Sequence, residues 1–344
     1  MNKQKVLVEI STKSVITIIA ILVLVFVAWK IRAIIFALII SIILMSGFSP
    51  LVDWFQKKGL NKLVSVALTY ILAIGALGLA LFAIIPPLIL RGQEFFIDLP
   101  IYLNSAIQSL NNTNLIQINS DEVINTLASR ASGYLFEARG ILLNVVSGFL
   151  TFLTISVFTF YLLLEKDKIK KNMFYFFPHL PKERVTNVVH KIDEKLGAWL
   201  RGQFVLMLIV GTMTYIGLTL LRVEFALPLA VIAGLLEAIA VIGPILASFP
   251  AIIIALVQYN SVLPVLGVAA LYILVQQLEN NLLVPKIMNR AVGVHPLAII
   301  LALLIGGSLF GIIGAVLAVP IAATVSVIIE DLRNHSSEEE PHRK

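Results

Sequence analysis

The chain has 344 residues, of which 59% are hydrophobic and only 13% are charged, and its mean hydropathy is +0.96. A soluble domain is nearer half apolar and a quarter charged, so this composition excludes an ordinary globular protein and requires lipid around most of the length. The absence of cysteine excludes disulfides and thiolate metal sites, and the formal charge of +6 is spread among loops, so we predict no nucleic-acid partner.

Seven charge-poor apolar runs follow one another along the chain. A spanning helix needs about 20 residues to cross a hydrocarbon core of about 30 Å. The first run is predicted to be retained, because Lys30 and Arg32 follow it in place of a small-residue cleavage site. The last two are too long for one helix each and must be subdivided, so we predict an all-α, polytopic membrane helical bundle that forms a single domain over 1–344. The runs are Val15–Trp29, Ala33–Val52, Leu63–Leu90, Gly140–Leu164, Gly202–Leu221, Phe225–Leu278 and Ala291–Ile329.

Two polar segments separate these runs and set the expected orientation. Residues 91–139 hold three basic and five acidic residues, whereas 165–201 hold nine basic and five acidic ones. The positive-inside rule therefore predicts that 91–139 is extracytoplasmic and that 165–200 is cytoplasmic. The final residues, 331–344, are predicted to form a disordered tail.

The cytoplasmic segment contains an amphipathic pattern that begins after Pro181. Apolar residues recur there at helical spacing, with lysines and arginines off the stripe. This pattern predicts a helix that lies on the membrane or against the bundle, and recruitment of a partner protein is a second interpretation. The stripe consists of Val185, Val188, Ile192, Leu196 and Trp199.

The run Phe225–Tyr259 cannot be one ordinary helix. A straight helix of this length would extend about 50 Å at 1.5 Å per residue, yet the run is too short for two spans. Gly243 and Pro244 fall near its middle and Pro250 follows. Each proline lacks an N–H and obstructs the carbonyl four residues back. We therefore predict a helix broken near the middle of the membrane, or a re-entrant hairpin.

The run Ala291–Ile329 repeats this design, with several glycines before Pro320. Gly307 and Gly311 form a small-xxx-small pair, which is typical of close helix packing. The two interrupted runs flank one ordinary helix, Val262–Leu278. Paired interruptions of this kind indicate a transporter site, because freed backbone groups at mid-depth can line a cavity, so we predict a solute path here. The glycines are Gly306, Gly307, Gly311 and Gly314.

The number of crossings stays open at this point. If Phe225–Tyr259 crosses the membrane once, the polar stretch Gln276–Pro296 lies outside and the C-terminus is cytoplasmic. If the run is a re-entrant hairpin, the same stretch is cytoplasmic, which Lys286 and Arg290 favour.

Glu237 is the one charged residue between Phe225 and Leu278. An ionised carboxylate at mid-membrane costs roughly 2.5–3.5 kcal/mol on insertion scales unless it is protonated, paired or wetted. A partly dry site favours the protonated form, so Glu237 is a candidate proton carrier beside the predicted break. The competing interpretation is a glutamate at a helix end near the interface.

A polar cluster ends the Val262–Leu278 helix just before Pro285, which is predicted to end or bend it. Helical spacing places Gln276, Glu279 and Asn280 on one face, with Asn281 beside it. These side chains either meet water at the interface or line the path, and in the second case Glu279 faces Glu237.

No enzymatic motif occurs in the sequence. It contains no phosphate-binding glycine loop, no HExxH, no GxSxG and no dinucleotide fingerprint. We therefore predict that the protein is not an enzyme, with no catalytic residues, no bound metal and no cofactor. Any driving force would come from a coupling ion, H⁺ or Na⁺.

Several elements resemble the AI-2E family of bacterial membrane transporters, also called the autoinducer-2 exporter or PerM-like family. The block Leu278–Ala323 closely resembles the C-terminal signature of this family. Phe48–Phe55, Leu200–Gln203 and Glu237–Pro244 resemble three further family elements, although Ala240 stands where the family has a proline. The resemblance implies about eight transmembrane segments, secondary transport, and a homo-oligomer such as a pentameric ring in the bacterial cytoplasmic membrane.

The resemblance leaves the transported species open. Some members are similar to exporters of autoinducer-2, others to sodium or lithium/proton antiporters. Glu237 suits coupling to a proton or cation, while the amides of Gln203, Asn280 and Asn281 suit a polyhydroxylated neutral solute. The leading hypothesis is export of a small polar solute such as autoinducer-2, with the lipid bilayer and a small molecule or ion as partners. Antiport is the second hypothesis, and a scaffold that recruits a cytosolic partner through Pro181–Leu200 is the third.

Overall fold

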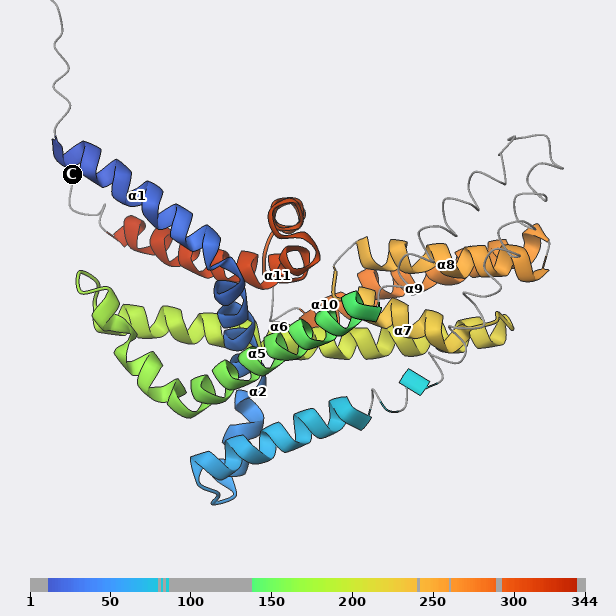
Figure 1. Ribbon diagram of the computed structural model, residues 1–344, viewed down its shortest axis with the longest axis horizontal. Coiled ribbons are helices and arrows are strands. Elements are labelled where there is room, and N and C mark those ends of the chain that lie inside the picture. The colour runs from blue at the N-terminus through green and yellow to red at the C-terminus, as the bar shows by residue number, and fades with distance from the viewer. Residues whose placement is uncertain are drawn as a thin grey trace, which may run out of the picture.

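The computed structural model describes residues 12–79, 82, 85–86, 138–239, 242–259, 261–288 and 293–338, and every regular element in these residues is helical. Seven of the helices are long and apolar enough to cross a membrane, which confirms the all-α membrane bundle. The predicted extracytoplasmic segment 91–139 lies almost entirely outside the described residues. The long helices are α1 (Thr12–Lys30), α2 (Arg32–Lys57), Lys62–Leu79, α5 (Ala138–Asn172), α6 (Lys182–Leu220), α8 (Ile242–Tyr259), α9 (Val262–Leu278) and α11 (Pro296–Glu338), and the short ones are η1 (Met173–Phe176), α7 (Ala226–Leu236) and α10 (Val284–Met288) (Figure 1).

The predicted amphipathic helix and the apolar run after it form one continuous helix, α6, of 39 residues. Its apolar stripe packs against the bundle, because Val185, Leu196 and Trp199 are buried. Leu196 and Trp199 share a cluster with Ile43 of α2 and Leu317 of α11. The stripe is thus covered by the chain's own helices.

The C-terminal segment differs from the prediction. Helix α11 continues to Glu338, so 331–338 are helical where a disordered tail was predicted. Asp331 accounts for part of this order, since Arg184 of α6 donates to it through Nε at 2.8 Å. Residues 339–344 lie outside the described residues.

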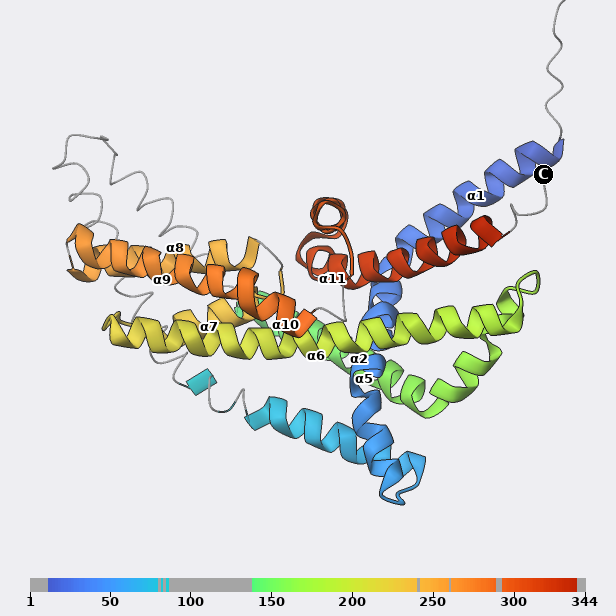
Figure 2. The same ribbon diagram turned by 180° about the vertical axis from the view of Figure 1, so that it is seen from behind.

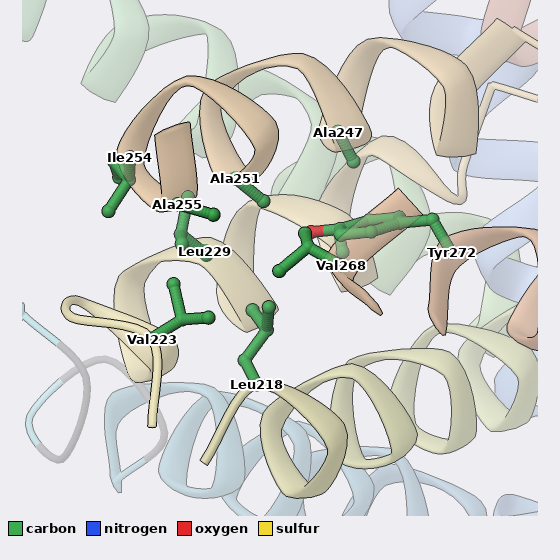
Figure 3. Close-up of a cluster of buried hydrophobic side chains, with 10 residues drawn as sticks. Leu218, Val223, Leu229, Ala247, Ala251, Ile254, Ala255, Val268 and Tyr272 are labelled. Carbon is green, nitrogen blue, oxygen red and sulfur yellow. The ribbon is translucent and has the colours of Figure 1, made fainter. Parts of the chain in front are cut away.

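Helices α6, α7, α8 and α9 form one lobe, on the right of Figure 1 and the left of Figure 2. In lipid, close packing rather than water exclusion holds helices together, and small residues permit it. Gly211 of α6 and Gly234 of α7 approach one another so closely that a Cβ on Gly234 would lie 2.9 Å from the Met207 carbonyl oxygen. The lobe's core is drawn in Figure 3 and contains Leu218, Val223, Leu229, Ala233, Ala247, Ala251, Ile254, Ala255, Val268 and Tyr272.

Within this lobe α7 and α8 form a helical hairpin. The two views show them side by side, with their junction at the end of the lobe nearest α10 and their other ends together (Figures 1 and 2). The turn into α7 uses a left-handed backbone at Phe225 (φ 58°), and the end of α8 ties to this turn, because Tyr259 donates through Oη to the carbonyl of Leu221 at 2.8 Å. This hairpin agrees with the re-entrant alternative, under which Gln276–Pro296 is predicted to lie on the side of the basic segment.

Helix α11 also folds back, at Gly311. Its backbone has a φ of 62° and a ψ of −144°, a conformation that glycine adopts readily and residues with a Cβ adopt rarely. Gly306 and Gly314 then lie against one another, so the closest approach is theirs rather than that of Gly307 and Gly311. Next to the fold, the ring of Phe310 stacks edge-on against Phe36 of α2 at 4.6 Å between centroids. The second interrupted run is therefore also bent at its glycines.

A buried ion cluster joins α2, α5 and α6 where the apolar part of α5 ends. Asp193 accepts a hydrogen bond from Ser46 at 2.6 Å, and its Oδ2 atom lies 3.2 Å from Nζ of Lys166 and 2.5 Å from Nζ of Lys170. The Asp193 side chain is 11% exposed. A second pair, Lys62 with Asp167, lies at the surface, since Asp167 is 81% exposed.

These two aspartates provide a matched comparison of stability. Asp193→Asn is expected to destabilise the protein by about 3 kcal/mol, because it leaves two largely buried ammonium groups without a counter-charge. Asp167→Asn is expected to cost less than about 1 kcal/mol, since an exposed pair is solvated. Thermal unfolding of both variants in a neutral detergent checks this, and equal shifts would contradict the assignment of the buried cluster.

Candidate functional site

Glu237 lies at the junction of the α7–α8 hairpin. Helix α7 ends at Leu236, one residue earlier, and α8 begins at Ile242. The predicted interruption is present, but it lies before Gly243 and Pro244, which belong to the first turn of α8. Ala240, where the family motif has proline, lies outside the described residues. Gly243 sits directly against the carbonyl of Leu236, with no room for a side chain, so glycine lets the two helix ends meet.

Glu279 lies at a second irregular backbone segment. Helix α9 spans Val262–Leu278, as predicted, and a π-helical turn, Glu279–Leu283, follows it. Pro285 explains the turn, because a proline removes one N–H and its ring clashes with the carbonyl four residues back, here that of Asn281. The wider turn relieves the clash without ending the helix, and such turns often occur at functional sites.

The structure brings these two carboxyl groups together. Glu237 is 4% exposed and Glu279 is 5% exposed. Their carboxyl groups lie near enough to each other to interact directly. Two amides support the pair: Gln276 donates to Oε2 of Glu279 at 3.3 Å, and Gln203 of α6 donates to the backbone carbonyl of Glu237 at 2.9 Å.

A hydrogen bond between two carboxyl groups requires a proton on one of them. In the described part of the chain, no lysine, arginine or histidine lies within 4.0 Å of either carboxyl group. Two ionised carboxylates in contact and away from water would repel strongly. Oε2 of Glu237 is buried and accepts no hydrogen bond from an N–H or O–H group of the described residues, so it is available to the shared proton, a ligand or a cation.

The predicted path residues divide into two groups. Gln203, Gln276, Glu237 and Glu279 meet, with Gly243 and Pro244 buried beside them. Asn280 and Asn281 are exposed, and Asn281 donates to Gln277 at 2.9 Å. Those two amides therefore lie outside the carboxyl pair.

The predicted helix-break and packing positions are spread over the fold. Pro250 lies inside α8, Pro285 follows the π turn, Gly307, Gly311 and Gly314 surround the bend in α11, and Pro320 is buried within α11.

Three features of the helices that carry the site were not predicted from the sequence. Tyr272 precedes Glu279 by two helical turns, its hydroxyl is buried without a partner, and it points into the lobe's core (Figure 3). Thr214 of α6 likewise has a buried hydroxyl without a partner. Gly202 lets α6 contact α10, since a Cβ there would lie 2.9 Å from the sulfur of Met288. Tyr272 lies seven residues before Glu279, so helical spacing places the two on the same face. That spacing was the sequence signal that could have identified Tyr272.

Comparison with known proteins agrees with this architecture. Residues 16–334 match the family model described as AI-2E family transporter. The chain is 31% identical to YrrI of Bacillus subtilis, named as a candidate transport protein, over 307 residues that cover 87% of this chain and 86% of the relative. It is 25% identical to YhhT of Escherichia coli K12, also named as a candidate transport protein, covering 88% and 86% of the two chains. It is 24% identical to PerM of the same strain, named as a candidate permease, covering 81% and 83%.

Proposed function

Because the chain belongs to the AI-2E family of membrane transporters, we propose that it is a secondary transporter that exports a small polar solute such as autoinducer-2, coupled to protons through Glu237 and Glu279. The observation that carries this proposal is the contact between the two buried carboxyl groups. Both belong to interrupted helix segments, where backbone groups are free to line a path.

The carboxyl pair supplies a physical route to coupling. While the pair holds one proton, the hairpin junction and the π turn stay in contact. Removal of that proton leaves two negative charges together in a medium of low dielectric, where their repulsion is strong. The segments then separate, or a cation or hydrogen-bonding solute enters between them. Proton binding and opening of the site are linked in this way.

The groups around the pair suit a neutral, hydroxyl-bearing solute. Oε2 of Glu237 is a free acceptor. The amides of Gln203 and Gln276 add donors and acceptors beside it, and their present partners belong to the site itself. A site that presents donors and acceptors to hydroxyl groups rejects apolar molecules, since its own polar groups would then stay unpaired.

The same oxygen atoms support one alternative, exchange of Na⁺ or Li⁺ for H⁺. Small hard cations prefer oxygen ligands, and a carboxyl pair without a basic neighbour attracts a cation when it loses its proton. The scaffold hypothesis has less support, because α2 and α11 cover the stripe that would recruit a partner.

Flux measurements on proteoliposomes that contain the purified chain test the proposal. Vesicles loaded with polyhydroxylated solutes of five to six carbons are expected to release them faster when a pH gradient is imposed, with proton movement recorded by an enclosed dye. Protein-free vesicles give the baseline. A cation-driven dye response without solute release would favour antiport, and release no faster than baseline in any gradient would contradict export.

A further inference from the structure

A cavity lies away from the carboxyl pair, between α2, α5, α6 and α11. Its volume is about 390 Å³, within the range of about 300–1,000 Å³ that ligand pockets occupy. Glu237 and Glu279 are not among its lining residues, so it is distinct from the candidate transport site. Most of its wall is aliphatic, with Ile39, Ile43, Leu162, Ile192 and Leu196 among the lining side chains.

The cavity is open on one side. Ile169 of α5 is 37% exposed, while Ile321 and Val325 of α11 are 39% and 45% exposed, and all three line it. The opening therefore lies between α5 and α11. Ile321 and Val325 belong to an apolar stretch of α11 that can cross a membrane, whereas Ile169 lies just beyond the apolar part of α5, so the opening lies at the edge of the hydrocarbon. An aliphatic wall of this kind excludes a polyhydroxylated solute and favours a hydrocarbon chain.

One end of the cavity carries excess positive charge. Lys166 and Lys170 both contact Oδ2 of Asp193, and the hydroxyl of Ser46 donates a hydrogen bond to the other oxygen, Oδ1. One carboxylate thus faces two ammonium groups, whose side chains are only 14% and 22% exposed. Each ammonium has three donors, so donors remain after the contact with Asp193. Burial of an unbalanced cation is costly, and an anion at this position would offset that cost.

We infer that this cavity binds one anionic phospholipid of the surrounding bilayer, with an acyl chain among the aliphatic side chains and the phosphate beside Lys166 and Lys170. The lysines lie where the apolar part of α5 ends, which is the depth of a lipid headgroup. The basic segment that contains them is the one that the charge rule places in the cytoplasm, and basic pockets between helices on that side suit anionic headgroups. The bound lipid would join α11 to α2, α5 and α6.

Native mass spectrometry of the full chain, delipidated and then mixed with equal phosphatidylglycerol and phosphatidylcholine, tests this inference. The unmodified protein is expected to retain one phosphatidylglycerol per chain and no phosphatidylcholine. Lys166→Gln with Lys170→Gln is expected to weaken that retention about thirtyfold, since each lysine near an anionic headgroup raises the affinity about fivefold. The matched control, Lys168→Gln with Lys171→Gln, removes the same charge from the same segment outside the cavity and is expected to leave retention unchanged.

A second variant separates the cavity from the charge. Val325→Trp fills the opening and is expected to remove the lipid although both lysines remain, whereas Ile328→Trp, exposed on the same helix but outside the cavity, is expected to retain it. Size-exclusion profiles show that each variant is folded. Equal retention of the two lipids, equal loss in both lysine pairs, or lipid retained by Val325→Trp would overturn the inference. Displacement of phosphatidylglycerol by equimolar oleate would overturn the phospholipid assignment.

Discussion

Glu237→Gln is expected to reduce solute flux in proteoliposomes at least about a hundredfold, with the protein folded and its oligomer size unchanged. Glutamine has nearly the shape of a protonated glutamate, so the contact with Glu279 can persist. It cannot release a proton, however, so the repulsion that would open the site never develops. Glu279→Gln is expected to have the same effect for the same reason. Initial rates of solute release under a fixed pH gradient measure both variants.

The double variant sharpens this test. Because the two carboxyl groups are proposed to act as one unit, the double substitution is expected to be no more severe than either single one. Glu194→Gln is the control, since Glu194 is an exposed carboxylate whose neighbour is His190, and its flux is expected to equal that of the unmodified protein. Normal flux in both single variants would remove the carboxyl pair from the mechanism.

Gly243→Ala is expected to destabilise the protein by about 2 kcal/mol and to reduce flux as strongly as the glutamate substitutions. A methyl group at this position would overlap the carbonyl of Leu236, which is backbone and cannot rotate away. The junction of α7 and α8 must then open, which moves Glu237 away from Glu279. Thermal unfolding in detergent and flux in proteoliposomes measure the two effects separately.

Gly75→Ala is the matched control for this substitution. Gly75 lies inside the helix Lys62–Leu79, and nothing lies within 4 Å of the position that its Cβ would occupy. Alanine is the better helix former, so stability is expected to stay equal or to rise by up to about 1 kcal/mol. If Gly243→Ala behaved like Gly75→Ala, the close contact at the hairpin junction would not hold in the membrane.

The sequence alone determined the class of the protein and the order of its elements. Apolar runs, interrupting glycines and prolines, and charge bias are local properties, and each acts on the residues beside it. This is why α9 was predicted with its observed bounds and why both interrupted runs are bent. Glu237 and Glu279 stood out for the same reason, since a carboxyl group among apolar residues is visible without a structure.

Only the tertiary structure decided which of these groups meet. The contact of Glu237 with Glu279 depends on two backbone irregularities, the hairpin junction and the π turn, whose geometry is set by packing against α6. The same packing left Asn280 and Asn281 exposed, although helical spacing had grouped Asn280 with Glu279. It also covered the amphipathic stripe of α6 and ordered α11 as far as Glu338. Helical periodicity tells which residues share a face, whereas the neighbour that covers that face is a long-range choice made by the whole bundle.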